Sequence, residues 1–229
     1  MGPEYPDGGQ ERPAAWRRRV CGVPHDPMKA LVINCTLKKS PETSNTEALF
    51  RTVTEQLERE GVEVDVVRAV DLDLAPGVVS EAVHDGDDWP GVHEKLLASE
   101  ILFMASPTWL GQPSSVAKRV LERMEGMMSE TDDDGRPVAY NRVAGVVVTG
   151  NEDGAHHVIS QITGGLQDIG YTIPGQAWTY WNQGPGPGPS FLEGGSGQDW
   201  SRSTGRAMAA NLLGVARALA ARPLGAPPQ

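Results

Sequence analysis

The sequence predicts an α/β fold in which a parallel β-sheet is covered by helices on both faces. Two observations predict it. Short apolar runs alternate along the chain with segments of helical periodicity, which is the pattern of repeated strand and helix units. Several of these runs are apolar at nearly every position, as strands are when both faces of the sheet are covered. We therefore expect a doubly wound sheet of five parallel strands.

The first half of the chain supplies three of these strands and two helices. The helix after the first strand is indicated by Leu49, Val53 and Leu57, which are spaced by four residues. Ser44 and Glu47 form the pattern of a capping box at its start. The expected strands are 29–34, 62–70 and 100–105, and the expected helices are 44–61 and 90–98.

The second half supplies two more strands and three more helices. Val116, Val120 and Met124 lie on one stripe of the first of these helices, and Met208 and Leu212 lie on one face of the last. The expected strands are 141–150 and 171–178, and the expected helices are 113–127, 154–170 and about 199–220.

Five strands that alternate with five helices favour the flavodoxin-like strand order 2-1-3-4-5. In such sheets, ligands bind at the carboxyl ends of the strands, near the point where the strand order reverses. The loops after the first, third and fourth strands are therefore the candidate binding regions.

Composition excludes several classes of protein. The net charge is -10 and the pI is about 5.0, which argues against nucleic-acid or anionic-membrane binding, because both need basic surface. No apolar run approaches the roughly 18 to 20 residues of a membrane span. The two cysteines, Cys21 and Cys35, are too few for a disulfide framework, which favours the reducing cytoplasm. We expect one domain at 28–222, a disordered extension at 1–27 and a loose end at 223–229.

The loop after the first strand, NCTLKKSPETSNTE, has the features of a phosphate-binding loop. It offers several hydroxyl groups and precedes a helix whose first N–H groups and dipole favour an anion. The alternative is that Ser44 and Glu47 only cap the helix. The loop contains neither GxxxxGKS/T nor GxGxxG, so it supports neither a nucleoside triphosphatase nor a dinucleotide fingerprint. A thiol phosphatase is excluded because Pro41 stands where an arginine is needed after Cys35, which we expect to be a small buried residue.

The loops after the third and fourth strands also have ligand-binding features. SPTWLGQPSS is stiffened by its two prolines, and Trp109 either packs over a flat ligand or covers the core or a subunit interface. TGNEDGAHH places glycines around three polar residues just before a helix, where backbone N–H groups can face a ligand. Asp153 either contacts that ligand or caps the helix. Adjacent residues on a helix point in different directions, so His156 and His157 predict no metal site.

These three motifs resemble those of the flavodoxin-like FMN-dependent NAD(P)H oxidoreductases, also called NADPH-dependent FMN reductases. The resemblance covers roughly residues 28–220, and the later stretch WTYWNQGPGPGPSF is also similar. It implies that FMN is the cofactor and that NAD(P)H is the co-substrate. The chain departs from the family where NCT replaces the usual Gly-Ser pair, so that Thr36 takes the place of the serine.

The roles of individual residues follow from the resemblance. Residues implied to hold the FMN phosphate are Thr36, Ser44, Asn45 and Thr46. Residues implied to flank the isoalloxazine ring are Pro107, Thr108, Trp109, Leu110 and Gly111, with Asn151, Glu152, Asp153 and Gly154 at its other edge. No catalytic side chain is expected, because the cofactor carries the chemistry. Segment 182–197 is either a lid or partner contact or a solvated linker.

The activity implied by the resemblance is transfer of reducing equivalents from NAD(P)H through FMN to a small-molecule acceptor. Such acceptors include quinones, nitro and azo compounds and free flavin. The resemblance also implies a homodimer or homotetramer. One alternative is a flavodoxin-like electron shuttle without NAD(P)H reductase activity of its own, which the acidic composition fits. Another is a flavin-free protein that keeps only the fold.

Overall fold

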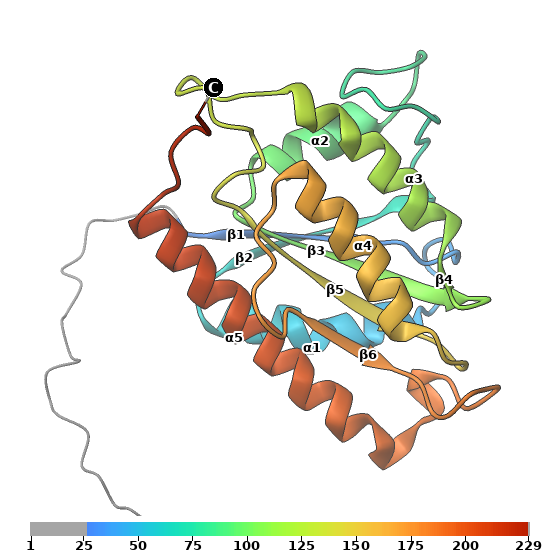
Figure 1. Cartoon of the computed structure of the whole chain (residues 1–229). Coiled ribbons are helices and arrows are strands. Elements are labelled where there is room, and N and C mark those ends of the chain that lie inside the picture. Colours follow the sequence, from blue (N-terminus) through green and yellow to red (C-terminus); the bar gives the residue numbers. More distant parts are fainter. Residues whose placement is uncertain (1–26, 229) are drawn as a thin grey trace, which may run out of the picture.

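The computed structural model describes residues 27–228. Within them, five parallel strands form a sheet in the order β2-β1-β3-β5-β6, and the short strand β4 pairs antiparallel with β3 (Figure 1). The predicted flavodoxin-like order is therefore confirmed for the parallel strands. The strands are β1 Lys29–Asn34, β2 Glu63–Arg68, β3 Ile101–Trp109, β4 Gln112–Pro113, β5 Val143–Thr149 and β6 Trp178–Trp181. The α-helices are α1 Asn45–Arg59, α2 Trp89–Leu97, α3 Ser115–Met124, α4 Ala155–Ile169 and α5 Asp199–Ala221.

Helices cover both faces of the sheet, as Figure 1 shows. Helices α1 and α5 pack on one face, and α2, α3 and α4 pack on the other. Strand β1 contributes side chains to the hydrophobic cores on both faces of the sheet. Ala30 and Val32 face α1 and α5, while Leu31 and Ile33 face the other three helices. This two-sided burial is the reason that the central strands are apolar at nearly every position.

Strand β3 is longer than the sequence predicted, and it ends in a tight hairpin. The strand expected at 100–105 continues through the residues expected to form a loop and pairs with β5 as far as Pro107. Trp109 then pairs with Gln112 across a two-residue turn. The turn residues Leu110 and Gly111 have φ angles of 52° and 69°, the signature of a type I′ hairpin turn. Proline and polar residues in this stretch concealed its strand character.

The last strand lies later in the chain than expected, and this prediction was wrong. The sequence suggested 171–178, whereas β6 is Trp178–Trp181. Pro174 lacks the N–H that a sheet ladder uses, and Gln176 has a φ of 55°, so this stretch cannot continue as a strand. In the short aromatic run after it, partly buried and fully buried residues alternate, and Thr179 is buried toward α5.

The structure describes the C-terminal end of the chain as far as residue 228 but does not describe residues 1–26. The disordered extension expected at 1–27 lies outside the described residues, apart from Pro27. In the segment expected to be a loose end, Leu224 accepts a hydrogen bond from the Asn141 side chain and donates one of 2.7 Å to it. The C-terminal segment is therefore attached at this point to the loop before β5.

Candidate functional site

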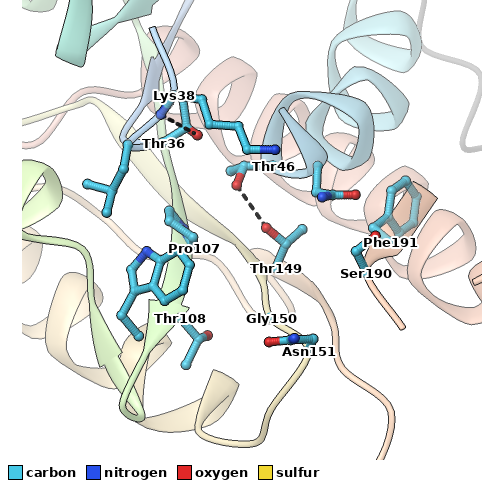
Figure 2. Close-up of a pocket in the computed structure, with 13 residues that line it drawn as sticks. Thr36, Lys38, Thr46, Pro107, Thr108, Thr149, Gly150, Asn151, Ser190 and Phe191 are labelled. Carbon is cyan, nitrogen blue, oxygen red and sulfur yellow. Dashed lines mark hydrogen bonds between the residues drawn. The ribbon is translucent and has the colours of Figure 1, made fainter. Parts of the chain in front are cut away.

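A cavity of about 220 Å³ opens at the carboxyl ends of β1, β3 and β5 (Figure 2). It lies beside β1, where the strand order reverses, which is where a doubly wound sheet binds its ligands. All three loops singled out from the sequence contribute to it. The residues that line it are Thr36, Leu37, Lys38, Asn45, Thr46, Pro107, Thr108, Trp109, Thr149, Gly150, Asn151, Ser190 and Phe191.

The start of helix α1 forms one wall of this cavity. The Ser44 hydroxyl accepts a hydrogen bond of 3.2 Å from the Glu47 N–H and so caps the helix. The reciprocal half of the expected capping box is not formed, because the Glu47 carboxylate binds Arg51 and Arg68 instead. The N–H groups of Asn45 and Thr46 have no intrahelical acceptor, and both residues line the cavity. These groups and the helix dipole make this wall suitable for an anion.

Arg68 holds the loop between β1 and α1 in place. Its guanidinium donates a hydrogen bond of 2.9 Å to the Glu42 carbonyl and forms an ion pair with Glu47. Burial opposes ionisation of the Glu47 carboxyl, but hydrogen bonds from Arg51 and Arg68 outweigh it and lower its pKa. The loop is therefore held in its form by contacts within the chain.

Lys38 brings a positive charge to the cavity, and sequence reasoning did not select it. Its Nζ donates a hydrogen bond of 3.1 Å to the Thr43 carbonyl, which places the ammonium group across the loop. Its backbone N–H donates to the Thr36 hydroxyl at 3.3 Å (Figure 2). The signal was present in the loop sequence, since a cation beside free N–H groups at a helix start is typical of phosphate binding.

The wall formed by β3 contains a buried hydroxyl without a hydrogen-bond partner. Thr108 is 3% exposed, and its Oγ1 has no partner among the described residues. Gly150 lies against it, since a Cβ at that glycine would be 3.0 Å from the Thr108 Cβ. Trp109, at the end of the same strand, is 53% exposed and therefore does not cover the core. A buried hydroxyl of this kind is expected to bind a ligand or water.

Six of the residues implied by the resemblance do not line the cavity. They are Ser44, Leu110, Gly111, Glu152, Asp153 and Gly154. Three of them connect the hairpin turn to the loop after β5: the Gly111 N–H donates to the Glu152 carboxylate at 3.4 Å, and a Cβ on Gly154 would be 2.7 Å from the Gly111 Cα. The helix cap is Gly154 with a φ of 106°, so Asp153 is not the cap.

Segment 182–197 contributes Ser190 and Phe191 to the cavity, which sequence reasoning did not name individually. Leu192 donates its N–H to the side-chain oxygen of Asn45 at 2.9 Å. The Trp181 indole N–H donates to the Pro189 carbonyl at 3.1 Å, and its ring packs edge-on against Phe191. Residues 189–192 are therefore packed against the site, whereas residues 183–187 of the same segment are exposed to solvent.

The remaining reactive side chains near the site have structural contacts. His156 packs against the rings of Trp178 and Tyr180, and His157 lies 3.2 Å from the side-chain oxygen of Gln112. Within residues 27–228, no group of three or more His, Cys, Asp or Glu side chains could hold a metal ion. Burial raises the pKa of the Cys35 thiol, which confirms that this cysteine is a small buried residue.

The sequence profile of the NADPH-dependent FMN reductases matches residues 28–184. The chain belongs to this family. Its members are FMN-dependent flavoprotein oxidoreductases, so the predicted FMN and NAD(P)H are the cofactor and co-substrate of the family. The cavity fits a flavin phosphate, because a lysine and N–H groups without intrahelical acceptors meet at one end and a buried hydroxyl lies in the β3 wall.

One similar protein is the 8-demethyl-8-aminoriboflavin-5'-phosphate synthase of Streptomyces davaonensis. It is 35% identical over 205 residues, which cover 86% of this chain and 80% of that protein. A similar solved structure is that of RosB with bound 8-demethyl-8-formylriboflavin-5'-phosphate. It has a TM-score of 0.78 and 34% identity, and the match covers 86% of this chain and 82% of RosB.

A third relative is much longer than this chain. It is a Mycobacterium bovis protein named divalent metal cation transporter MntH, which is 42% identical over 202 residues. The match covers 86% of this chain but only 30% of that protein. Among residues 27–228, no helix has the length and apolar character needed to cross a membrane.

Proposed function

We propose that this protein is an FMN-dependent oxidoreductase that takes reducing equivalents from NAD(P)H and passes them to a small-molecule acceptor. One observation carries the proposal. Polar groups that remain free to bind a ligand converge on one cavity: the N–H groups of Asn45 and Thr46 have no intrahelical acceptor, and the buried Thr108 hydroxyl has no partner among the described residues. A phosphate and a polar heterocycle satisfy these groups together.

The phosphate end of the proposed site is the wall formed by the start of α1. There the N–H groups of Asn45 and Thr46, the Thr36 hydroxyl and the Lys38 ammonium would hold the phosphate. Ser44, which the resemblance placed among the ligands, would act indirectly by capping the helix.

The ring end of the proposed site lies between β3 and the loop after β5. Pro107, Thr108 and Trp109 would flank one side of the isoalloxazine, and Asn151 would lie at its other edge. Bound FMN would supply hydride acceptance from NAD(P)H and transfer of one or two electrons to an acceptor. The residues of the chain bind and orient the cofactor, and no side chain of theirs is needed as an acid or base.

An equilibrium titration with FMN, followed by steady-state kinetics, tests the proposal. We expect stoichiometric FMN binding and then oxidation of NADPH or NADH that depends on an added quinone, nitro compound, azo compound or free flavin. A protein that bound no FMN would refute the proposal, and one that bound FMN but oxidised NAD(P)H only slowly would be an electron shuttle.

A second candidate function is chemical modification of the flavin itself. It is favoured by the Streptomyces davaonensis synthase, which is named for a modified riboflavin phosphate and is matched over 80% of its length. Mass spectrometry of the flavin after incubation separates the two functions. Unchanged FMN together with NAD(P)H oxidation supports the oxidoreductase, whereas a changed mass that requires the protein supports the synthase.

A further inference from the structure

The cavity wall contains a pair of hydroxyl groups, of which sequence reasoning named Thr46 but not Thr149. The Oγ1 atoms of Thr46 and Thr149 are 2.8 Å apart, and this hydrogen bond joins the first turn of α1 to the last residue of β5 (Figure 2). The two residues are 2% and 4% exposed, and both line the cavity. Within the part of the chain that the structure describes, neither hydroxyl has another hydrogen-bond partner.

A count of protons shows what this pair can do. Each threonine hydroxyl has one proton to donate and two lone pairs to accept with. The bond between Thr46 and Thr149 uses one of the two protons, so the other is available to an acceptor in the cavity. Beside the N–H groups at the start of α1, the acceptor that best suits this proton is an anionic oxygen.

We infer that Thr149 is a positioning residue for the FMN phosphate. It donates its hydroxyl proton to Thr46, so that the Thr46 O–H is directed at a phosphate oxygen. Thr46 is the member of the pair that contacts the phosphate, because it lies in the first turn of α1, where the free N–H groups are. Donation from Thr149 also polarises the Thr46 hydroxyl and strengthens its bond to an anion. The inference rests on the proposed function, namely that this cavity binds FMN.

The competing explanation is that the pair only ties α1 to β5. The chain offers a matched control for this explanation in a second threonine pair, which is not among the residues that line the cavity. The Oγ1 atoms of Thr179 and Thr204 are 2.7 Å apart, and Thr179 is fully buried. Loss of that pair changes the stability of the fold without touching the flavin site.

The experiment measures the affinity of the full chain for FMN and for riboflavin, which differ only in the phosphate. We expect Thr149→Val to weaken FMN binding roughly 10-fold, because the Thr46 O–H is no longer directed at the phosphate and its hydrogen bond to that charged group is lost or weakened. Riboflavin binding should change by less than about 2-fold, since only contacts to the phosphate depend on the pair. Thr149→Ser keeps the hydroxyl and should bind FMN as the unaltered protein does.

Three outcomes would overturn the assignment. They are equal weakening of both flavins by Thr149→Val, no weakening of either, and a Thr149→Ser variant as weak as the valine variant. Thr179→Val should leave the ratio of FMN to riboflavin affinity unchanged even if it lowers the melting temperature. If the unaltered protein bound neither flavin, the proposed function itself would fail, which is a different result from any of these.

Discussion

Two regions of the molecule bury an oxygen-bearing side chain, and they differ in whether the chain itself supplies its hydrogen bonds. In the first region, the loop between β2 and α2 surrounds an ion pair between Asp87 and Arg123, with 2.8 Å between Oδ2 and the guanidinium nitrogen. Both side chains are completely buried. The carboxylate also accepts hydrogen bonds from the backbone N–H groups of Ala75, Val83 and Trp89. This network uses all the lone pairs of the carboxylate internally.

The second region is the cavity at the carboxyl ends of the strands. There the Thr108 hydroxyl is buried without a partner among residues 27–228, and the N–H groups of Asn45 and Thr46 have no intrahelical acceptor. The Asp87 carboxylate, whose hydrogen bonds are all made within the chain, supports the fold, whereas the Thr108 hydroxyl can still bond to a ligand or water. An unpartnered buried atom does not define a site by itself, because Arg123 Nε and Trp89 Nε1 also lack partners among the described residues. Thr108 differs from them in that it lines the cavity.

The largest effect is expected from breaking the buried Asp87–Arg123 ion pair. Arg123→Met removes the cation and leaves the Asp87 carboxylate buried without its charge partner. We expect the free energy of unfolding to fall by about 3 to 5 kcal/mol, as it does when one member of a buried ion pair is removed. Chemical denaturation monitored by tryptophan fluorescence measures this change.

The matched control is Arg136→Met. Arg136 pairs with Asp132 and Asp134 at the surface, so its loss should change the free energy of unfolding by less than about 1 kcal/mol. Equal effects of the two substitutions would show that burial of the Asp87–Arg123 pair has no special role.

Acidification should also lower the free energy of unfolding, by a smaller amount, because it protonates Asp87. Burial opposes ionisation of Asp87, but hydrogen bonds from Val83, Trp89, Ala75 and Arg123 outweigh it and lower the pKa to about 2. Because the folded pKa lies below the unfolded value of about 3.9, ionised Asp87 stabilises the fold fully above pH ~4. This contribution, about 2 kcal/mol, should be lost as the pH falls from ~4 to ~2.

Urea unfolding between pH 2 and 5 measures the loss, and Asp87→Asn provides the comparison. The amide does not titrate, so the variant should be less stable at pH 5 and should lose less stability on acidification. Parallel pH profiles of the two proteins would contradict the assignment of this loss to Asp87.

Removal of the Thr108 hydroxyl should not destabilise the ligand-free protein, in contrast to Arg123→Met. Thr108→Val keeps the shape of the side chain and removes a buried group that has no internal partner. We expect the ligand-free protein to be unchanged or up to about 1 kcal/mol more stable, while FMN binds roughly 5-fold more weakly. Thermal unfolding of the ligand-free protein and FMN titration measure the two effects.

The control for this substitution lies two residues earlier on the same strand. The Ser106 hydroxyl donates to the Pro107 carbonyl at 2.8 Å and accepts from the Ser114 N–H at 3.1 Å. Ser106→Ala should therefore destabilise the ligand-free protein by about 1 to 2 kcal/mol. If Thr108→Val destabilised it as much, Thr108 would belong to the structural network.

The sequence was sufficient for the parts of this architecture that depend on periodic burial. All five α-helices and the order of the parallel strands could be predicted, because a sheet covered on both faces imposes apolar runs and each helix must present an apolar stripe. The position of β6 could not be predicted. Burial alternates over only four residues of this strand, which is too short a pattern to outweigh the strand-like YTI before Pro174.

Some residues of the candidate site could likewise be predicted from the sequence, and others could not. Thr36, Thr46 and Asn151 could be placed in one region because carboxyl ends of parallel strands meet at one edge of a sheet. Phe191 reaches the cavity from a Gly/Pro-rich segment without periodicity, so no pattern pointed to it. Arg123 lies 36 positions from its partner Asp87, and such long-range pairs leave no local signal.

The smallest effect on stability is expected at the cavity residue Trp109, whose role the sequence left open. Its ring is 53% exposed, so Trp109→Ala should change the free energy of unfolding by less than about 0.5 kcal/mol. If the ring packs against the flavin, FMN or acceptor affinity should fall roughly 5-fold, since aromatic contacts contribute about 1 kcal/mol. Trp181→Ala, at a residue 2% exposed, should instead lower stability by about 3 to 5 kcal/mol. A Trp109→Ala variant that lost stability but kept its affinities would show that Trp109 supports the fold and does not contact the flavin or the acceptor.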